Sequence, residues 1–215
     1  MNKKYEYDSE FPLSVWIGNL GKYNEGYLIG EWLKLPATDK EINKLLERIG
    51  ISDKPDVNGI YYEEYFCADY DNYTGLKDVL NYEYDLSYLN YFAYKLEQLS
   101  PKEYEKLRLI VKNQNLEFYE TLNFLAQDFI NKIEDYKDFD KKDIGTINYD
   151  ISFFENDIDY KNFLYSKEIQ DRDYDGDGVK DIYDADFRDR DVETFGDLDK
   201  KEKDQIKDMN KGRTR

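Results

Sequence analysis

The segment Val15–Leu35, VWIGNLGKYNEGYLIGEWLKL, constrains the fold more than any other stretch of the chain. It begins with Val15-Trp16-Ile17, an apolar run of strand-forming residues, and ends with Tyr27–Leu35, where large apolar residues alternate with small or charged ones. Asn24-Glu25-Gly26 lies between the two runs and is typical of a turn. The segment therefore predicts a β-hairpin.

A helix and a third strand are expected next. Thr38-Asp39-Lys40-Glu41 has the pattern of a capping box, in which the hydroxyl and the carboxylate each bond to the other residue's backbone. Apolar residues then recur at helical spacing up to Gly50, which predicts the end of the helix. Ile60–Tyr70 is typical of a strand and predicts a buried thiol for the single cysteine, Cys67. Residues 12–71 thus form one α+β unit with a three-stranded antiparallel sheet and a helix.

The remaining chain is predicted to be mainly helical. Asp85 is a candidate cap for a helix with apolar positions from 86 to 96, and Ser100-Pro101-Lys102-Glu103 begins another that reaches about Val111. These two helices define a middle unit over 72–113. A third unit over 114–170 follows, and its expected elements are a long helix over Asn115–Tyr136, a short strand or loop over Ile144–Phe153, and a short helix over Ile158–Ile169. The predicted fold class is α+β with an elongated body, and residues 171–215 form an acidic tail.

The charge of the chain limits its function. With 48 acidic and 31 basic residues the net charge is −17, which excludes a general nucleic-acid binder because such proteins need a basic surface. Three interpretations remain: solubility, a cation-binding surface, or a surface that fits a basic groove which normally holds DNA. The chain has no histidine and no phosphate-binding glycine loop, so we expect no enzymatic activity.

The sequence shows no sign of a membrane protein. The N-terminal stretch lacks the apolar core of a signal peptide, and no apolar run approaches the ~20 residues that a membrane span needs. One cysteine cannot form an internal disulfide, which fits a reducing compartment. We therefore expect a cytoplasmic protein without a membrane partner.

Three segments resemble the ArdA antirestriction family. The clearest is Asn19–Gly26, NLGKYNEG, and the others are Leu125–Ile130, LAQDFI, and Ile158–Phe163, IDYKNF. The similarity covers roughly residues 13–168. It implies an acidic protein of conjugative plasmids and transposons that imitates duplex DNA, occupies the DNA-binding groove of type I restriction–modification enzymes, and forms a homodimer through its third unit.

The acids expected to meet such a partner are concentrated between Tyr61 and Leu99, where eight acidic residues stand against two lysines. Duplex DNA carries about one charge per 1.7 Å of axis, so an imitation needs closely spaced carboxylates with few cations between them. The candidate partner-binding residues are Glu63, Glu64, Asp69, Asp71, Asp78, Glu83, Asp85 and Glu97.

The tail contains a second candidate site, DYDGDGVKDIYD, with the spacing of a calcium loop. Alternate carboxylates converge on one ion while Gly178 allows a sharp turn, and oxygen ligands suit Ca²⁺. The candidate ligands are Asp173, Asp175, Asp177, Asp181 and Asp184. Asp184 stands where a longer glutamate is usual, and the pattern is similar to the DxDxDG loops of thrombospondin type 3 repeats and dockerins. A solvated aspartate-rich tail without a bound ion remains the other interpretation.

Two alternatives to inhibition of a type I enzyme stay open. The chain is a calcium-dependent adaptor or scaffold in which the aspartate-rich tail binds the partner, or it imitates DNA for another DNA-binding defence protein. No cofactor is required by any of these readings except Ca²⁺ in the adaptor.

Calorimetric titration with Ca²⁺ tests the tail. We expect the full chain to bind the ion and a chain that ends at Gln170 to release no binding heat, because the truncation removes all five candidate carboxylates. Equal heats from both chains would contradict the assignment of the loop.

Overall fold

The computed structural model describes residues 4–76, 79–80, 84–144 and 152–165. The chain divides into two compact units, and each is described by itself. Unit 1 comprises Met1–Val15, Lys34–Ala37 and Asp69–Leu164, and unit 2 comprises Trp16–Leu33, Thr38–Ala68 and Tyr165–Arg215. The division falls within each of the three strands. The three-unit organisation expected from the sequence, with its acidic tail, stays a prediction.

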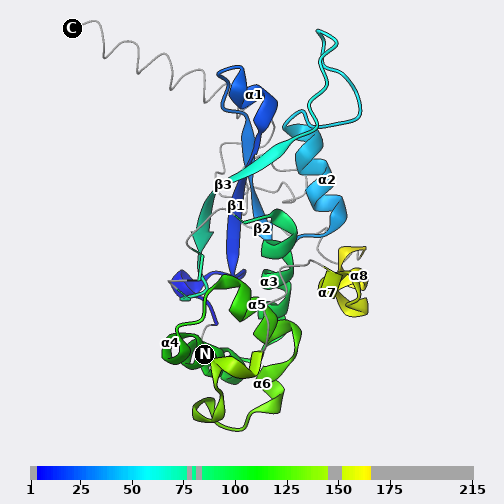
Figure 1. Cartoon of the computed structure of the whole chain (residues 1–215). Helices are drawn as coiled ribbons and strands as arrows, with labels where there is room; N and C mark the ends of the chain where they lie inside the picture. The colour runs from blue at the N-terminus through cyan, green and yellow to red at the C-terminus, as the bar shows by residue number, and fades with distance from the viewer. Residues whose placement is uncertain (1–3, 77–78, 81–83, 145–151, 166–215) are drawn as a thin grey trace, which may run out of the picture. The chain divides into compact units, whose positions relative to one another are not determined.

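The described strands form one antiparallel sheet in the order β2-β1-β3 (Figure 1). The central strand β1 spans Leu13–Asn19, β2 spans Gly30–Leu35 and β3 spans Tyr65–Asn72. The Leu20 N–H donates to the Glu64 carbonyl, and the Tyr73 N–H donates to the Pro12 carbonyl, so β1 and β3 run in opposite directions. The α+β class and the three-stranded antiparallel sheet are thus confirmed.

The hairpin prediction was right about the pairing of β1 with β2 and wrong about their connection. A short helix, α1 (Leu20–Asn24), follows β1 directly, and the second strand begins at Gly30 rather than Tyr27. The Asn19 side chain caps α1 by accepting the Lys22 N–H at 2.9 Å. The Tyr27 N–H then donates to the Lys22 carbonyl around Gly26, whose φ of +90° suits glycine. The predicted turn is therefore the end of a helix.

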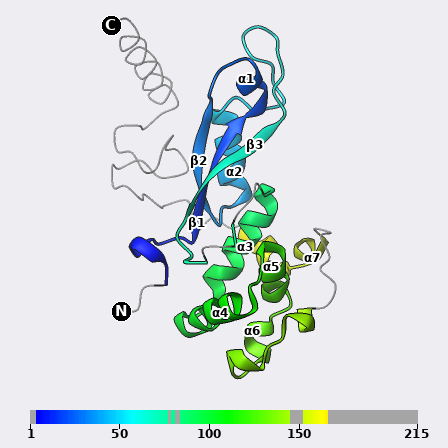
Figure 2. The ribbon, with the colours of Figure 1, turned by 60° about the vertical axis from the view of Figure 1, so that its left-hand side comes forward.

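Helix α2 (Asp39–Arg48) follows the prediction closely. Its capping box is formed by Thr38 and Glu41, and Gly50 ends the helix at a φ of +80°. Leu45 of α2 is buried, and Figures 1 and 2 both show α2 beside the unit 2 part of the sheet. The buried Asn19 amide donates to the Ile49 carbonyl at 3.0 Å, so one side chain joins the start of α1 to the end of α2.

Strand β3 is shorter at its start than expected. Residues 60–64 are not part of the strand, and pairing begins at Tyr65. Cys67 is buried within β3, as the sequence predicted.

Unit 1 contains the predicted pair of capped helices, α3 (Leu86–Gln98) and α4 (Pro101–Gln114). The Asp85 carboxylate accepts the Ser87 N–H at 2.8 Å, and Ser100 with Glu103 forms a capping box in front of α4. Helix α4 ends at Asn115, which has a left-handed φ of +50°.

The single helix predicted over Asn115–Tyr136 is wrong. The chain forms α5 (Phe118–Ala126) and α6 (Phe129–Lys132), separated by Asp128 at a left-handed φ of +54°. The Asp128 N–H donates to the Leu125 carbonyl, which closes α5, and aspartate tolerates this conformation better than most residues. The apolar residues keep a helix-like spacing on both sides of this break, because α5 and α6 contact each other and both bury apolar side chains.

The remaining described elements are short helices. They are η1 (Glu6–Asp8), η2 (Tyr136–Asp138), η3 (Lys141–Ile144), α7 (Ser152–Glu155) and α8 (Ile158–Leu164). The last of these confirms a short helix from Ile158. The predicted strand or loop over Ile144–Phe153 coincides with the end of η3 and the start of α7, and its residues 145–151 lie outside the described part of the chain.

Aromatic rings form much of the core of unit 1. Tyr84 stacks on Phe118 with ring centroids 4.0 Å apart, and Phe92 meets the same ring edge-on at 5.2 Å, which joins α3 to α5. On α3, Tyr91 contacts Tyr160 of α8 at 4.9 Å. Tyr91 and Tyr160 therefore serve packing, because each buries its ring while its hydroxyl bonds to a polar partner, Asp157 and Asn90 respectively.

A buried asparagine fixes the chain between β2 and α2 to the helices of unit 1. Asn90 of α3 accepts the Ala37 N–H at 2.6 Å and donates to the Ala37 carbonyl at 2.8 Å. Its amide also donates to the Tyr160 hydroxyl at 3.0 Å. Asn90 is 1% exposed, so these bonds have no competition from water.

Asn90→Ala should lower the free energy of unfolding by about 2–4 kcal/mol, because it leaves the buried Ala37 N–H and carbonyl without their side-chain partner. Urea denaturation measures the change. Asn162→Ala, on the exposed side of α8, is the matched control and should change stability by less than about 0.5 kcal/mol. An equal effect of the two substitutions would contradict the role given to Asn90.

Candidate partner-binding surface

Two of the candidate acids lie together in unit 2. Glu63 and Glu64 are exposed and come directly before β3. They line a shallow hollow of about 370 Å³ together with Gly21 and Asn24 of α1 and with Tyr61 and Tyr62. The Glu64 carbonyl accepts the Leu20 N–H at 3.0 Å, which holds this stretch against the start of α1. The structure thus holds the backbone that carries these two exposed glutamates against the start of α1.

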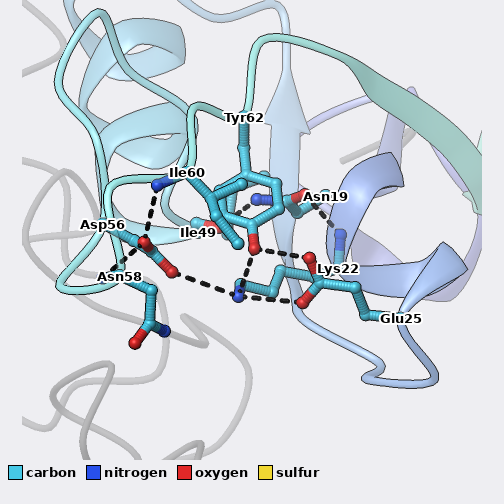
Figure 3. A network of polar contacts seen from close by, with 8 residues as sticks. All are labelled: Asn19, Lys22, Glu25, Ile49, Asp56, Asn58, Ile60 and Tyr62. Atoms are coloured by element: carbon cyan, nitrogen blue, oxygen red, sulfur yellow. Dashed lines mark hydrogen bonds and ion pairs between the residues drawn. The ribbon is translucent and has the colours of Figure 1, made fainter.

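Beside this hollow, a polar network surrounds the Lys22 ammonium (Figure 3). Its Nζ donates to the Tyr62 hydroxyl at 2.6 Å and to Glu25 Oε2 at 3.1 Å, and Asp56 Oδ2 lies 3.6 Å away. The Tyr62 hydroxyl in turn donates to Glu25 Oε1 at 2.6 Å. The network therefore links α1 to the loop that precedes β3.

The loop itself is ordered around Asp56. One oxygen of its carboxylate accepts the N–H groups of Asn58 and Ile60, at 2.8 and 3.0 Å. These backbone bonds, followed by the charge of Lys22, hold the pKa of the Asp56 carboxyl below its usual value. These contacts therefore favour the ionised form of Asp56, which is the form that accepts both loop N–H groups.

The same contacts shift the other members of the network. The hydrogen bond from Tyr62, and then that from Lys22, lowers the pKa of the Glu25 carboxyl, and the bond to Glu25 raises the pKa of Tyr62. The hydrogen bond to Tyr62 contributes most to raising the pKa of Lys22. Because the folded pKa of Glu25 is lowered, its contribution to stability is present above the ordinary carboxyl pKa and is lost as pH falls through the lowered one.

The other described candidate acids belong to unit 1. Asp69 is exposed on β3, and Asp71, two residues on and on the same face of the strand, is half-buried and accepts the Ser14 hydroxyl at 3.3 Å. Asp85 is exposed and caps α3. Their role in partner binding stays a prediction.

Glu97 is the least free of these acids. It is half-buried near the end of α3, and its carbonyl accepts the Lys4 ammonium at 2.8 Å. Burial lowers the pKa of Lys4 to about 8, while the charges of Glu97 and Glu103 act in the opposite direction. A cation close to Glu97 reduces the negative field that it presents to a partner.

Several predicted site residues lie outside the described part of the chain. They are Asp78, Glu83 and the calcium-loop residues Asp173, Asp175, Asp177, Asp181 and Asp184. Within the described ranges, no group of three or more cysteine, aspartate or glutamate side chains is placed to hold a metal ion.

The network around Lys22 was not predicted from the sequence. Glu25 was assigned to a turn, and Asp56 lies in a loop that showed no recognisable pattern. The only available signal was the NLGKYNEG segment, which contains both Lys22 and Glu25. Tyr62 and Asp56 reach these residues through contacts between segments more than 30 residues apart, as the spacing of 40 between Lys22 and Tyr62 shows.

The structure thus shows a mixed α+β fold whose described part exposes several of the candidate acids. Comparison with protein families gives a match to the family described as antirestriction protein (ArdA), over residues 15–180. The chain belongs to this family. The match includes the first residues of the aspartate-rich tail, beyond the similarity that the sequence segments suggested. A search of curated proteins found no matching sequence.

The family description names protection against restriction and no enzymatic reaction. None of the helices in the described ranges is long and apolar enough to cross a membrane.

Tyr62→Phe should raise the pKa of the Glu25 carboxyl toward its ordinary value, because it removes the hydrogen bond that contributes most to lowering it. Titration of the glutamate side-chain carbons by NMR measures this pKa directly. Tyr61→Phe removes an exposed hydroxyl next in sequence and should leave Glu25 unchanged. A Glu25 pKa that is the same in Tyr62→Phe as in the unmodified chain would rule out the network as its cause.

Proposed function

We propose that this protein inhibits a type I restriction–modification enzyme by occupying its DNA-binding groove, and so protects incoming mobile-element DNA. The observation that carries the proposal is the family membership of a chain with a net charge of −17 that exposes Glu63, Glu64, Asp69 and Asp85. A groove that binds DNA is lined with cations, and exposed carboxylates offer these cations an alternative to phosphate.

The spacing of the acids supports contact through several elements at once. Residues two apart on a strand are separated by about 6.6–6.8 Å, so Asp69 and Asp71 carry charge more sparsely than one DNA strand, with its charge every ~3.4 Å of axis. The adjacent pair Glu63 and Glu64 raises the density just before the same strand. No single strand can therefore replace a duplex, and the inhibitor needs acids from the helices as well.

A decoy also has to hold its charges in place before it meets the enzyme. In unit 2 the Lys22 network fixes the segment before β3, and in unit 1 Asp85 is held as the cap of α3. Acids fixed in this way lose little conformational freedom on binding, which favours affinity. No chemical step is required of the protein.

Glu63→Gln with Glu64→Gln should weaken inhibition of DNA cleavage roughly three- to thirty-fold, because two charge contacts of up to about 1 kcal/mol each are lost. The measurement is a titration of the protein against a type I enzyme and its DNA at several salt concentrations. Inhibition by the unmodified chain should fall steeply with salt, and the double variant should show a smaller salt dependence.

Glu47→Gln with Glu134→Gln is the matched control. It removes the same charge from two exposed glutamates outside the candidate set. An equal loss in both double variants would show that net charge alone acts, and failure of the unmodified chain to compete with DNA even at low salt would refute the proposed function.

A further inference from the structure

One end of unit 2 exposes more apolar surface than imitation of DNA requires. Its apolar side chains are each between 44% and 101% exposed. We call them the tip surface, and they are Tyr23, Tyr27, Leu28, Val57, Ile60 and Tyr61. Phosphate groups are fully polar, so these side chains have no counterpart on a DNA backbone. Contiguous exposed apolar groups with a polar rim are typical of protein interaction sites.

The polar network joins the two segments that carry the tip surface. Residues 20–28 include α1 and its end, and residues 56–62 form the loop before β3. Lys22 bonds to Tyr62 and pairs with Asp56 across the two segments, and its ammonium also lies 5.9 Å from the centre of the Tyr27 ring. Figure 3 shows Tyr62, Glu25 and Asp56 directed toward the Lys22 ammonium. The tip surface is therefore fixed before a partner arrives.

The rim of the tip surface is acidic. Acidic residues in these two segments and next to them outnumber the lysines. The lysines are Lys22 and Lys54, and the acidic residues are Glu25, Asp53, Asp56, Glu63 and Glu64. Lys22 is already engaged by Glu25 and Asp56. A second copy of this chain would bring two acidic rims together, which like-charge repulsion opposes. Charge complementarity instead selects a partner whose apolar patch is edged by lysine and arginine.

We propose that the tip surface docks on a protein surface with an apolar centre and a basic edge. This inference deepens the proposed function, because the basic edge of a DNA-binding groove, where the groove meets ordinary protein surface, is a place of this chemistry. The tip surface would then supply contacts that do not depend on salt, in addition to the charge contacts of the exposed acids. Tyrosine is favoured at such contacts because it buries a large ring at little cost in conformational freedom.

A synthetic peptide tests the surface without any enzyme. The probe is a helical peptide with leucine on one face and lysine on the other, and its control has glutamine in place of every leucine at equal charge. We expect the leucine peptide to bind the full chain about tenfold more tightly and to shift the NMR signals of Tyr23, Leu28 and Tyr61. Equal affinities for the two peptides, or shifts spread over the acids elsewhere, would overturn the proposal.

Matched variants locate the effect. Leu28→Ser with Tyr61→Ser should abolish the preference for the leucine peptide. Ile158→Ser with Tyr165→Ser, which removes still more exposed apolar side chains elsewhere, should retain it. Light scattering tests whether a second copy of the chain covers the tip surface instead. If the unmodified chain self-associates and the variant with Leu28→Ser and Tyr61→Ser does not, a second copy is the occupant and the proposal is wrong.

The enzyme assay separates this proposal from the proposed function. Against a type I enzyme, Leu28→Ser with Tyr61→Ser should weaken inhibition roughly tenfold at every salt concentration, with an unchanged salt dependence. Full inhibition by this variant would overturn docking at the tip while leaving the acidic decoy intact. If the unmodified chain itself fails to inhibit, the proposed function fails, and the peptide comparison alone decides the tip surface.

Discussion

Repulsion among carboxylates is the constraint under which this chain folds. An excess of 17 negative charges opposes compaction. Several of the acids form stabilising hydrogen bonds or ion pairs within the fold. Glu41 and Glu103 complete capping boxes, and the buried Glu31 carboxylate pairs with Arg48 at 2.7 Å. Aromatic rings supply the cohesion against this repulsion, most clearly around Tyr91 in unit 1. The acids left exposed on such a frame are those available to a partner.

Local signals in the sequence were sufficient for most elements of the fold. Both capping boxes and the Asp85 cap depend on residues within three positions of each other, and all were found where predicted. The errors arose where a polar residue adopted a left-handed conformation or a cap was unexpected. Asp128 divides a hydrophobic pattern into α5 and α6, and Asn19 starts a helix where a turn was predicted. Periodicity does not register a break when both sides of it bury apolar groups.

The candidate site was less predictable than the fold. Glu63 and Glu64 are exposed just before β3, but the network that holds the preceding loop could not be predicted from local sequence. Lys22, Tyr62 and Asp56 are brought together by the packing of α1 against the loop before β3, a contact between distant segments that no local pattern records. The tip surface was missed for the same reason, because Tyr27 and Tyr61 appear in the sequence as ordinary strand residues.

Zero-length carbodiimide cross-linking tests the central claim most directly, because it joins a carboxylate only to an amine in contact with it. In a complex with a type I restriction–modification enzyme, we expect Glu63, Glu64 and Asp69 to cross-link to lysines that contact DNA. A specific duplex added beforehand should abolish these products. Cross-links to lysines outside the groove, or products that persist when DNA fills it, would contradict the account.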